Sequence, residues 1–251
     1  GVVLALWRCR PSYKKSCRIE GLDVDIEIRV GNVFSQPGTW VIGTNTEFET
    51  KITPDLISEN SLQGQFTRRN FQSDEDLKEL LRNKLSQIEP TGSVMRDGKD
   101  VPEYAMGTIV PVRVKHDSAL FIAMARLNDH GVARVTSSEI TDCLVQLWQF
   151  VEAKASMSTI IAPVLGSRFG RIGMGWNRER IVQEMIASFA AACSQATFCE
   201  KLVIVLSPKD VVQYNVDLDS LGDYLAHVCK YAGRSEDSVG VAAAGTAISG
   251  Q

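Results

Sequence analysis

Apolar positions along the chain follow two kinds of spacing, and the first kind predicts strands. Asp25–Val30 alternates polar and apolar residues, as a half-buried strand does. Trp40–Asn45 is a short apolar run after a Pro37-Gly38 turn, which predicts a second strand. Two further apolar runs are separated by Lys115–Ser118, which suits a hairpin, and two almost wholly apolar runs predict interior strands covered on both faces. These four runs are Met106–Val114, Leu120–Leu127, Thr159–Leu165 and Leu202–Leu206.

The second kind of spacing predicts helices between these strands. Two helices begin with a capping pattern, Ser73 with Asp76 and Thr136 with Glu139, in which hydroxyl and carboxylate groups satisfy free amides. The apolar stripes of the helices begin at Leu77, Ile140, Ile181 and Leu221. Because strands alternate with helices and no linker divides residues 20–230, we predict one α/β domain, over residues 20–232, with its sheet between helical layers.

The two ends of the chain differ from this pattern. Gly1–Trp7 is apolar, and the basic residues that follow it have no acidic neighbour before Glu20. Seven residues cannot span a bilayer, which takes about 20, but they can end a transmembrane helix with a basic cytoplasmic flank. An edge strand with a soluble basic linker is the alternative, so residues 1–19 are expected to form a juxtamembrane or N-terminal segment. Residues 233–251, rich in Gly, Ala and Ser, are expected to form a flexible tail or to order on a partner.

Composition and charge argue against nucleic-acid binding, a disulfide framework and a metal site. A net charge of −3 argues against non-specific nucleic-acid binding, which needs a basic face. The six cysteines show no CxxC spacing, and they are interpreted as reduced thiols of a cytosolic protein. None of the three histidines belongs to a group of residues with the spacing of a metal site, so we expect no structural metal.

The segment Gly166–Gly175 carries the clearest chemical signal. A buried strand ends at Leu165 and leads into four glycines and two arginines, before a helix begins near Trp176. Glycines let backbone amides approach an anion, and a following helix adds its positive end. Arg168 and Arg171 can add charge-assisted bonds to phosphate. We therefore predict a phosphate-binding loop, against the alternative of a surface loop with solvated arginines.

The spacing in this loop excludes better-known motifs. A P-loop needs lysine where Arg171 stands, and GxGxxG is not met because the glycines are spaced in the reverse order. A nucleophile elbow needs glycine in place of Leu165 and Phe169, so Ser167 is not predicted to be a hydrolase serine.

Three shorter segments offer polar groups near strand ends. Asn32 follows the first strand, where a side chain can read the edge of a base; a simple Gly-Asn turn is the alternative. Asn45 ends the second strand and offers ribose hydroxyls both a donor and an acceptor. Ser61–Thr67 is expected to be a loop, in which Gly64 would allow closure over a sugar.

Together these segments resemble macro domains, and most closely the macro domains of bacterial Thoeris anti-phage effectors. The resemblance rests on Gly31–Phe34, Gly43–Thr50, Ser61–Phe66 and Leu165–Ile172 and covers roughly residues 25–210. It implies a three-layer α/β/α fold with a mixed central sheet of about six strands. It also implies that the ligand is ADP-ribose or an ADP-ribose conjugate. Macro domains carry Asp where Asn32 stands, a departure that bears on base selectivity.

The resemblance implies specific ligand contacts. Asn32 would contact the adenine edge, Val33 would add its backbone amide, and Asn45 would meet the distal ribose. The distal sugar, or the group attached to it, would be flanked by Gly64, Gln65 and Phe66. The diphosphate would lie on Gly166, Ser167, Arg168, Phe169, Gly170 and Arg171.

Three functions are compatible with these residues. The first and favoured one is a sensor without catalytic residues or cofactors, which relays ligand occupancy to a membrane segment or an oligomer. The resemblance implies a homo-oligomer and a TIR-domain enzyme that makes the signal without binding physically. It also implies a cytoplasmic domain tethered to the inner membrane through a preceding segment. The alternatives are an ADP-ribosyl hydrolase, using Asn45 and a water with Glu47 or Asp129, and an interaction module with a structural glycine loop.

Overall fold

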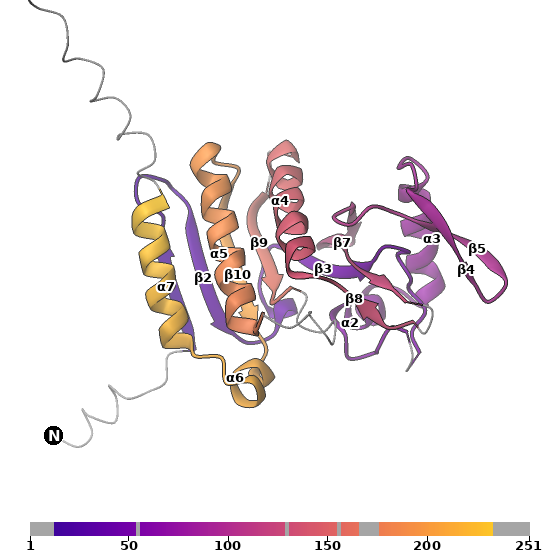
Figure 1. Cartoon of the computed structure of the whole chain (residues 1–251), viewed down its shortest axis with the longest axis horizontal. Helices are drawn as coiled ribbons and strands as arrows, with labels where there is room; N and C mark the ends of the chain where they lie inside the picture. Colours follow the sequence, from indigo (N-terminus) through magenta and orange to yellow (C-terminus); the bar gives the residue numbers. More distant parts are fainter. Residues whose placement is uncertain (1–12, 54–55, 129–130, 155–156, 166–175, 233–251) are drawn as a thin grey trace, which may run out of the picture.

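The computed structural model describes residues 13–53, 56–128, 131–154, 157–165 and 176–232. Their central element is a mixed sheet of eight strands in the order β1-β2-β10-β9-β3-β7-β6, with β8 paired to β7 (Figure 1). The strands are β1 (Lys14–Arg18), β2 (Asp25–Val30), β3 (Thr39–Asn45), β6 (Ile109–Val114), β7 (Asp117–Leu127), β8 (Ala133–Arg134), β9 (Met157–Pro163) and β10 (Cys199–Leu206). The five central strands are parallel, whereas β1 and β6 run antiparallel to their neighbours. The expected α/β class and mixed sheet are confirmed, with eight strands instead of about six.

Helices cover both faces of the sheet because its inner strands bury side chains on both sides. On one face lie α4 (Ser137–Lys154), α5 (Arg178–Gln195) and α7 (Leu218–Tyr231), side by side in Figure 1. The other face carries α2 (Leu62–Asn70) and α3 (Asp74–Leu85). Alternate residues of β3 separate the two cores: Val41 packs in the first, and Trp40 and Ile42 pack in the second. The remaining helical elements are the 3₁₀ turn η1 (Val33–Ser35) and α6 (Pro208–Tyr214).

Strand β1 lies within residues 1–19, which were expected to precede the domain. It pairs antiparallel with β2, Lys14 opposite Arg29 and Arg18 opposite Asp25, so the sheet begins before residue 20. Among the described residues no helix is long and apolar enough to cross a bilayer. Gly1–Trp7 and residues 233–251 lie outside the described ranges.

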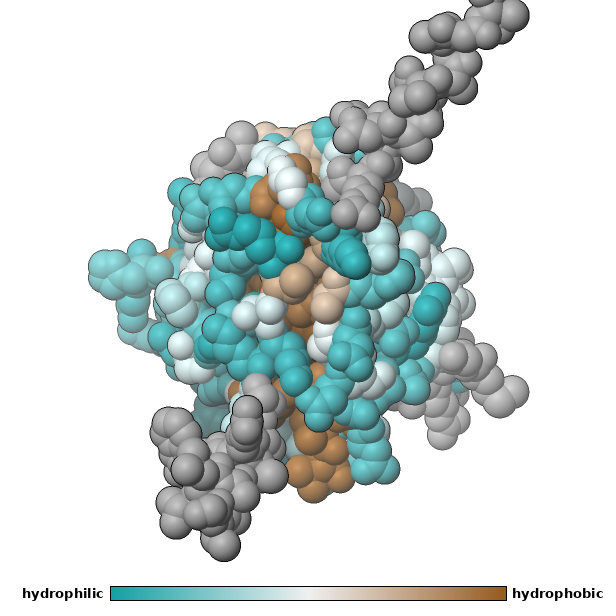
Figure 2. Space-filling view, turned by 90° about the vertical axis from the view of Figure 1, so that its left-hand side faces the viewer, coloured by the Kyte–Doolittle hydropathy of each residue, from teal (hydrophilic) through white to brown (hydrophobic). Residues whose placement is uncertain are grey.

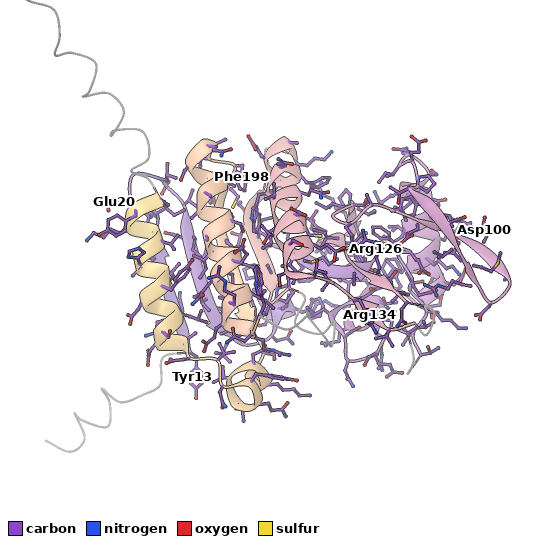
Figure 3. The ribbon with its side chains drawn as sticks, viewed as in Figure 1. Tyr13, Glu20, Asp100, Arg126, Arg134 and Phe198 are labelled. Atoms are coloured by element: carbon purple, nitrogen blue, oxygen red, sulfur yellow. The ribbon has the colours of Figure 1, made fainter. Side chains whose placement is uncertain are left out.

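Two local predictions need correction. Ser61–Thr67 is not a loop, because Leu62–Asn70 forms α2 with Ser61 as its N-cap. A two-stranded hairpin, β4 (Gly92–Arg96) and β5 (Lys99–Glu103), was not predicted. It projects from the end of the molecule farthest from α7, with Asp100 near its tip (Figure 3).

Candidate functional site

Parallel strands bring the predicted polar segments to one edge of the sheet. Strands β3, β9 and β7 end there, and between their ends and the start of α2 lies a hollow of about 530 Å³. Its lining is Gly43, Thr44, Asn45, Leu56, Ile57, Ser58, Ser61, Leu62, Gln63, Leu127, Gly131, Ala133, Pro163, Val164 and Leu165. Mostly apolar walls with a few polar groups are typical of small-molecule sites, and the carboxyl edge of parallel strands is where such sites form.

Asn45 lines this hollow, but its carbonyl oxygen is already used. The side chain is 4% exposed, and its Oδ1 accepts hydrogen bonds from the backbone N of Glu47 and of Glu49, both at 3.1 Å. A carboxamide has one oxygen and one NH₂ group. Asn45 can therefore offer a ligand its N–H donors, but not the free carbonyl that the sequence suggested.

Thr44, which the sequence analysis did not single out, is the second polar side chain at this point. It is 2% exposed, and its Oγ1 has no hydrogen-bond partner within the described part of the chain. An unpaired buried hydroxyl costs about 1–3 kcal/mol of stability. For this reason, the large majority of buried polar side-chain atoms in native proteins have a hydrogen-bond partner. Thr44 lines the hollow, but its Oγ1 has almost no accessible surface, so a bound molecule would reach the hydroxyl only after the side chain turns.

Asn32 and Val33 follow β2 at the same edge of the sheet but do not line the hollow. Asn32 is exposed and caps η1, with its Oδ1 accepting from the backbone N of Phe34 at 2.9 Å. Its outward group is therefore the NH₂ donor. Val33 is buried in the core on the α2 side, which leaves only its backbone for ligand contact.

Gly64, Gln65 and Phe66 occupy α2 and do not line the hollow. The Gly64 backbone N donates to Ser61 Oγ at 2.9 Å, and the exposed Gln65 side chain donates to the Asn60 carbonyl at 2.9 Å. Phe66 is fully buried, with its ring 5.4 Å from that of Phe121. Its side chain serves the core, and the residues of this segment that reach the hollow are Ser61, Leu62 and Gln63.

The predicted phosphate loop, Gly166 to Arg171, lies outside the described residues, whereas Leu165 before it and the residues from Trp176 onward are described. Val164 and Leu165 line the hollow at the end of β9. On the other side α5 starts at Arg178, where Asn177 Oδ1 accepts from the Arg180 backbone N at 2.8 Å. The loop thus joins the carboxyl end of a parallel strand to the amino end of a helix, the arrangement in which anions are bound in other α/β proteins.

The chain matches a known protein family over most of its length. The model of the macro domain of Thoeris protein ThsA matches residues 26–207. The chain belongs to the ThsA macro-domain family. A curated relative, Thoeris protein ThsA of Bacillus amyloliquefaciens (strain Y2), is 23% identical over 153 residues. This stretch is 59% of the present chain and 50% of the relative, so the macro domain spans about half the length of that relative.

Solved macro domains share the fold at low sequence identity. A point mutant of the Oceanobacillus iheyensis macrodomain is 14% identical, with a TM-score of 0.52 over 84% of this chain and 98% of the other. The macro domain of ganglioside induced differentiation associated protein 2 is 12% identical, with a TM-score of 0.51 over 82% and 85%. Both support a macro-domain fold.

Sequence reasoning missed two side chains that organise this macro domain's site. Gln63, 3% exposed, donates through Nε2 to the Glu49 carbonyl at 2.7 Å and so joins α2 to the segment after β3. Arg178 pairs with Asp210 at 2.5 Å and lies 3.3 Å from the centroid of the Tyr214 ring. This contact ties the start of α5 to α6. The sequence did contain a signal for α2, because a serine directly before the first apolar residue, as Ser61 stands before Leu62, is a typical helix N-cap.

Glu47, the carboxylate proposed for the hydrolase alternative, is held by a cation from the β4–β5 hairpin. It is 4% exposed, and its Oε1 lies 2.5 Å from an Arg96 nitrogen. The same guanidinium donates to the carbonyls of Leu127 and Asn128, both at 3.0 Å. The Glu47 carboxylate is therefore occupied by Arg96, and Glu47 is not among the residues that line the hollow. Asp129 lies outside the described residues.

Proposed function

We propose that this macro domain is the ligand-sensing part of an anti-phage effector and binds an ADP-ribose-type nucleotide at the carboxyl edge of its sheet. Family membership supports the defence role, since the matching family and the curated relative are both Thoeris protein ThsA. The observation that carries the binding is the hollow of about 530 Å³ with the unpaired hydroxyl of Thr44 in its wall.

In this proposal the distal ribose and its attached group occupy the hollow. The N–H donors of Asn45 and the hydroxyl of Thr44 contact them, the loop after Leu165 holds the diphosphate, and Asn32 meets the base. The ligand is the product of a TIR-domain enzyme. Its binding favours one of two states of a homo-oligomer or of a membrane segment that precedes the domain, because a ligand shifts an equilibrium only by binding one state better.

The first test replaces Thr44 with valine, which has the same shape without the hydroxyl. If the hydroxyl bonds to ligand, Thr44→Val weakens ADP-ribose binding by about 3–10-fold, the loss of one hydrogen bond. The melting temperature stays the same or rises, since a buried unpaired group is removed. Isothermal titration calorimetry and a thermal melt measure the two effects.

Thr46→Val is the matched control, two residues along the chain. Its hydroxyl is fully buried and already donates to Glu103 at 2.9 Å, so this variant should lose stability and keep its affinity. If wild type binds no ADP-ribose derivative more tightly than millimolar, the proposed function is wrong. If Thr44→Val melts lower and binds normally, the hydroxyl is structural.

A second test separates sensing from hydrolysis. Because Arg96 holds the carboxylate of Glu47, we expect a flat time course when the wild-type domain is incubated with an ADP-ribosylated protein. Released ADP-ribose is measured by chromatography, with a known hydrolase as the positive control. Turnover that is abolished in Asn45→Ala, while the fold persists by circular dichroism, would establish the enzyme instead.

A further inference from the structure

Strand β1 and helix α7 run side by side in the same direction along one edge of the molecule. Lys15 pairs with Asp219 near the start of α7 at 2.6 Å, and the backbone N of Glu20, beyond the end of β1, donates to the Cys229 carbonyl at 2.8 Å. Figure 3 shows Tyr13 and Glu20, which flank β1, near opposite ends of α7. The strand and the helix therefore lie side by side over their whole length, with their starts at one level and their ends at another.

This register brings Cys17 opposite the last turns of α7. Lys15 packs on Gly222, and two strand residues advance the chain by about 6.6 Å, or about four helix residues, to the level of Ala226. Helix side chains tilt toward the amino end, so Cys229 points back to that level. Cys17 is paired with Ile26 of β2, whose side chain lies in the core beneath α5 and α7, so the Cys17 thiol faces α7.

Cys17 and Cys229 line the same open hollow of about 610 Å³, together with Ile19, Leu22 and Ala226. The Cys17 thiol donates to the Arg18 carbonyl at 3.6 Å, and Cys17 is close enough to Cys229 to contribute to its raised pKa. Figure 2, which faces this flank, shows apolar surface between polar side chains. Cys17 is partly exposed, whereas Cys229 is fully buried. Cys17 is thus open to small molecules, and Cys229 is enclosed beside the same hollow.

We propose that Cys17 and Cys229 form a reversible disulfide that fastens β1 to α7. Bond formation requires the two sulfurs to approach to about 2.05 Å, and both side chains already line the same hollow. The cross-link would close a loop containing almost all of the described chain, and long loops give the largest restriction of the unfolded state. The proposal stands independently of the nucleotide site.

The bond forms by thiol–disulfide exchange with a low-molecular-weight disulfide such as glutathione disulfide. Cys17 is the partly exposed partner, so its thiolate attacks first and expels one glutathione thiolate, whereas burial encloses Cys229 and raises the pKa of its thiol to about 12. The Cys229 thiolate then attacks the Cys17 sulfur and expels the second. Two protein thiols lose two electrons and two protons, and glutathione disulfide takes up both as two glutathione thiols.

The experiment treats the whole chain with glutathione disulfide and digests it under non-reducing conditions. We expect mass spectrometry to find a Cys17–Cys229 peptide pair that dithiothreitol removes, with a loss of two free thiols. The oxidised protein should melt about 5–10 °C higher than the reduced one. In Cys17→Ser the pair and the melting shift should both be absent.

Other cysteines provide the internal controls. Cys143 and Cys193 are fully buried and should stay reduced throughout. A disulfide that instead joins Cys17 or Cys229 to Cys9, or thiols that glutathione disulfide leaves unchanged, would overturn the proposal. The peptide map of the wild-type chain decides this even if a serine variant folds poorly.

Discussion

Replacing Gly64 with alanine is expected to lower the stability of this macro domain and its ligand affinity together. A Cβ at this position would overlap the carbonyl oxygen of Ser58 and come within 3.0 Å of the Glu59 Cα. Both are backbone atoms, which cannot rotate aside. Alanine favours a helix over glycine by about 1 kcal/mol, but overpacking of this kind costs about 1–3 kcal/mol or more. The steric cost is the larger effect.

Helix α2 cannot move away to relieve this overlap, because Phe66 is fixed in the core and Ser61 caps the helix. The Ser58–Glu59 segment must shift instead, and Ser58 lines the hollow. We expect Gly64→Ala to lower the melting temperature by about 4–8 °C, equivalent to about 2 kcal/mol, and affinity for ADP-ribose about tenfold. Calorimetric melts and titrations measure both. The exposed neighbour Gln65→Ala is the control and should change neither quantity much; a Gly64→Ala domain that behaves as wild type contradicts this packing.

Removing the charge of Glu27 should have the other large effect, on stability and its dependence on pH. The carboxylate is 1% exposed and joins three strands, with Lys14 Nζ at 3.0 Å, Lys201 Nζ at 2.6 Å and Arg29 Nε at 2.6 Å. Removing one partner of a buried ion pair typically costs about 3–5 kcal/mol. Lys14 and Lys201 can turn to solvent, so we expect Glu27→Gln to cost about 3 kcal/mol.

The pH dependence follows from the pKa of Glu27. Burial alone would raise this pKa, but hydrogen bonds from Lys201 and Lys14 and the charge of Arg29 outweigh burial and hold it below its ordinary value. A lowered pKa in the folded state contributes stability above the unfolded pKa of about 4.3, and this contribution is lost as the pH falls through the folded value.

Urea unfolding between pH 7 and pH 3 tests this contribution. The stability advantage of wild type over Glu27→Gln should shrink toward the acid end of that range. Glu59→Gln is the matched control, since Glu59 is 63% exposed and its pair with Arg68 is worth at most about 1 kcal/mol. A constant difference between wild type and Glu27→Gln over the whole range would show that the carboxylate titrates normally.

Continuous apolar runs were the parts of the fold that the sequence predicted best. Thr159–Leu165 and Leu202–Leu206 contain much of β9 and β10 because interior strands must be apolar on both faces. By contrast, β1 has the sequence Lys-Lys-Ser-Cys-Arg, without apolar alternation. It is a strand because β2 offers a free edge and α7 offers a surface for Lys15 and Cys17, and both partners are distant in sequence.

At the site, the sequence predicted the location of polar residues better than their hydrogen bonding. Strand ends correctly placed Asn45 beside the hollow, but the bonds of its Oδ1 to Glu47 and Glu49 depend on the tertiary path of the chain. Phe66 was assigned to the ligand and lies in the core, since an aromatic residue after glycine suits either environment. Thr44 lacked any local signal, because its role depends on a missing hydrogen-bond partner.

Arg96 connects the segment after β3 with the end of β7, because its guanidinium bonds to Glu47 and to the carbonyls of Leu127 and Asn128. The Arg96 guanidinium is planar and bonds to both segments at once. Neither segment can therefore move to admit a molecule unless the other segment and the β4–β5 hairpin move with it. We therefore expect adaptation to ligands of different size in the lining segment that these bonds do not include, where Leu56 is exposed and Ile57 is partly buried.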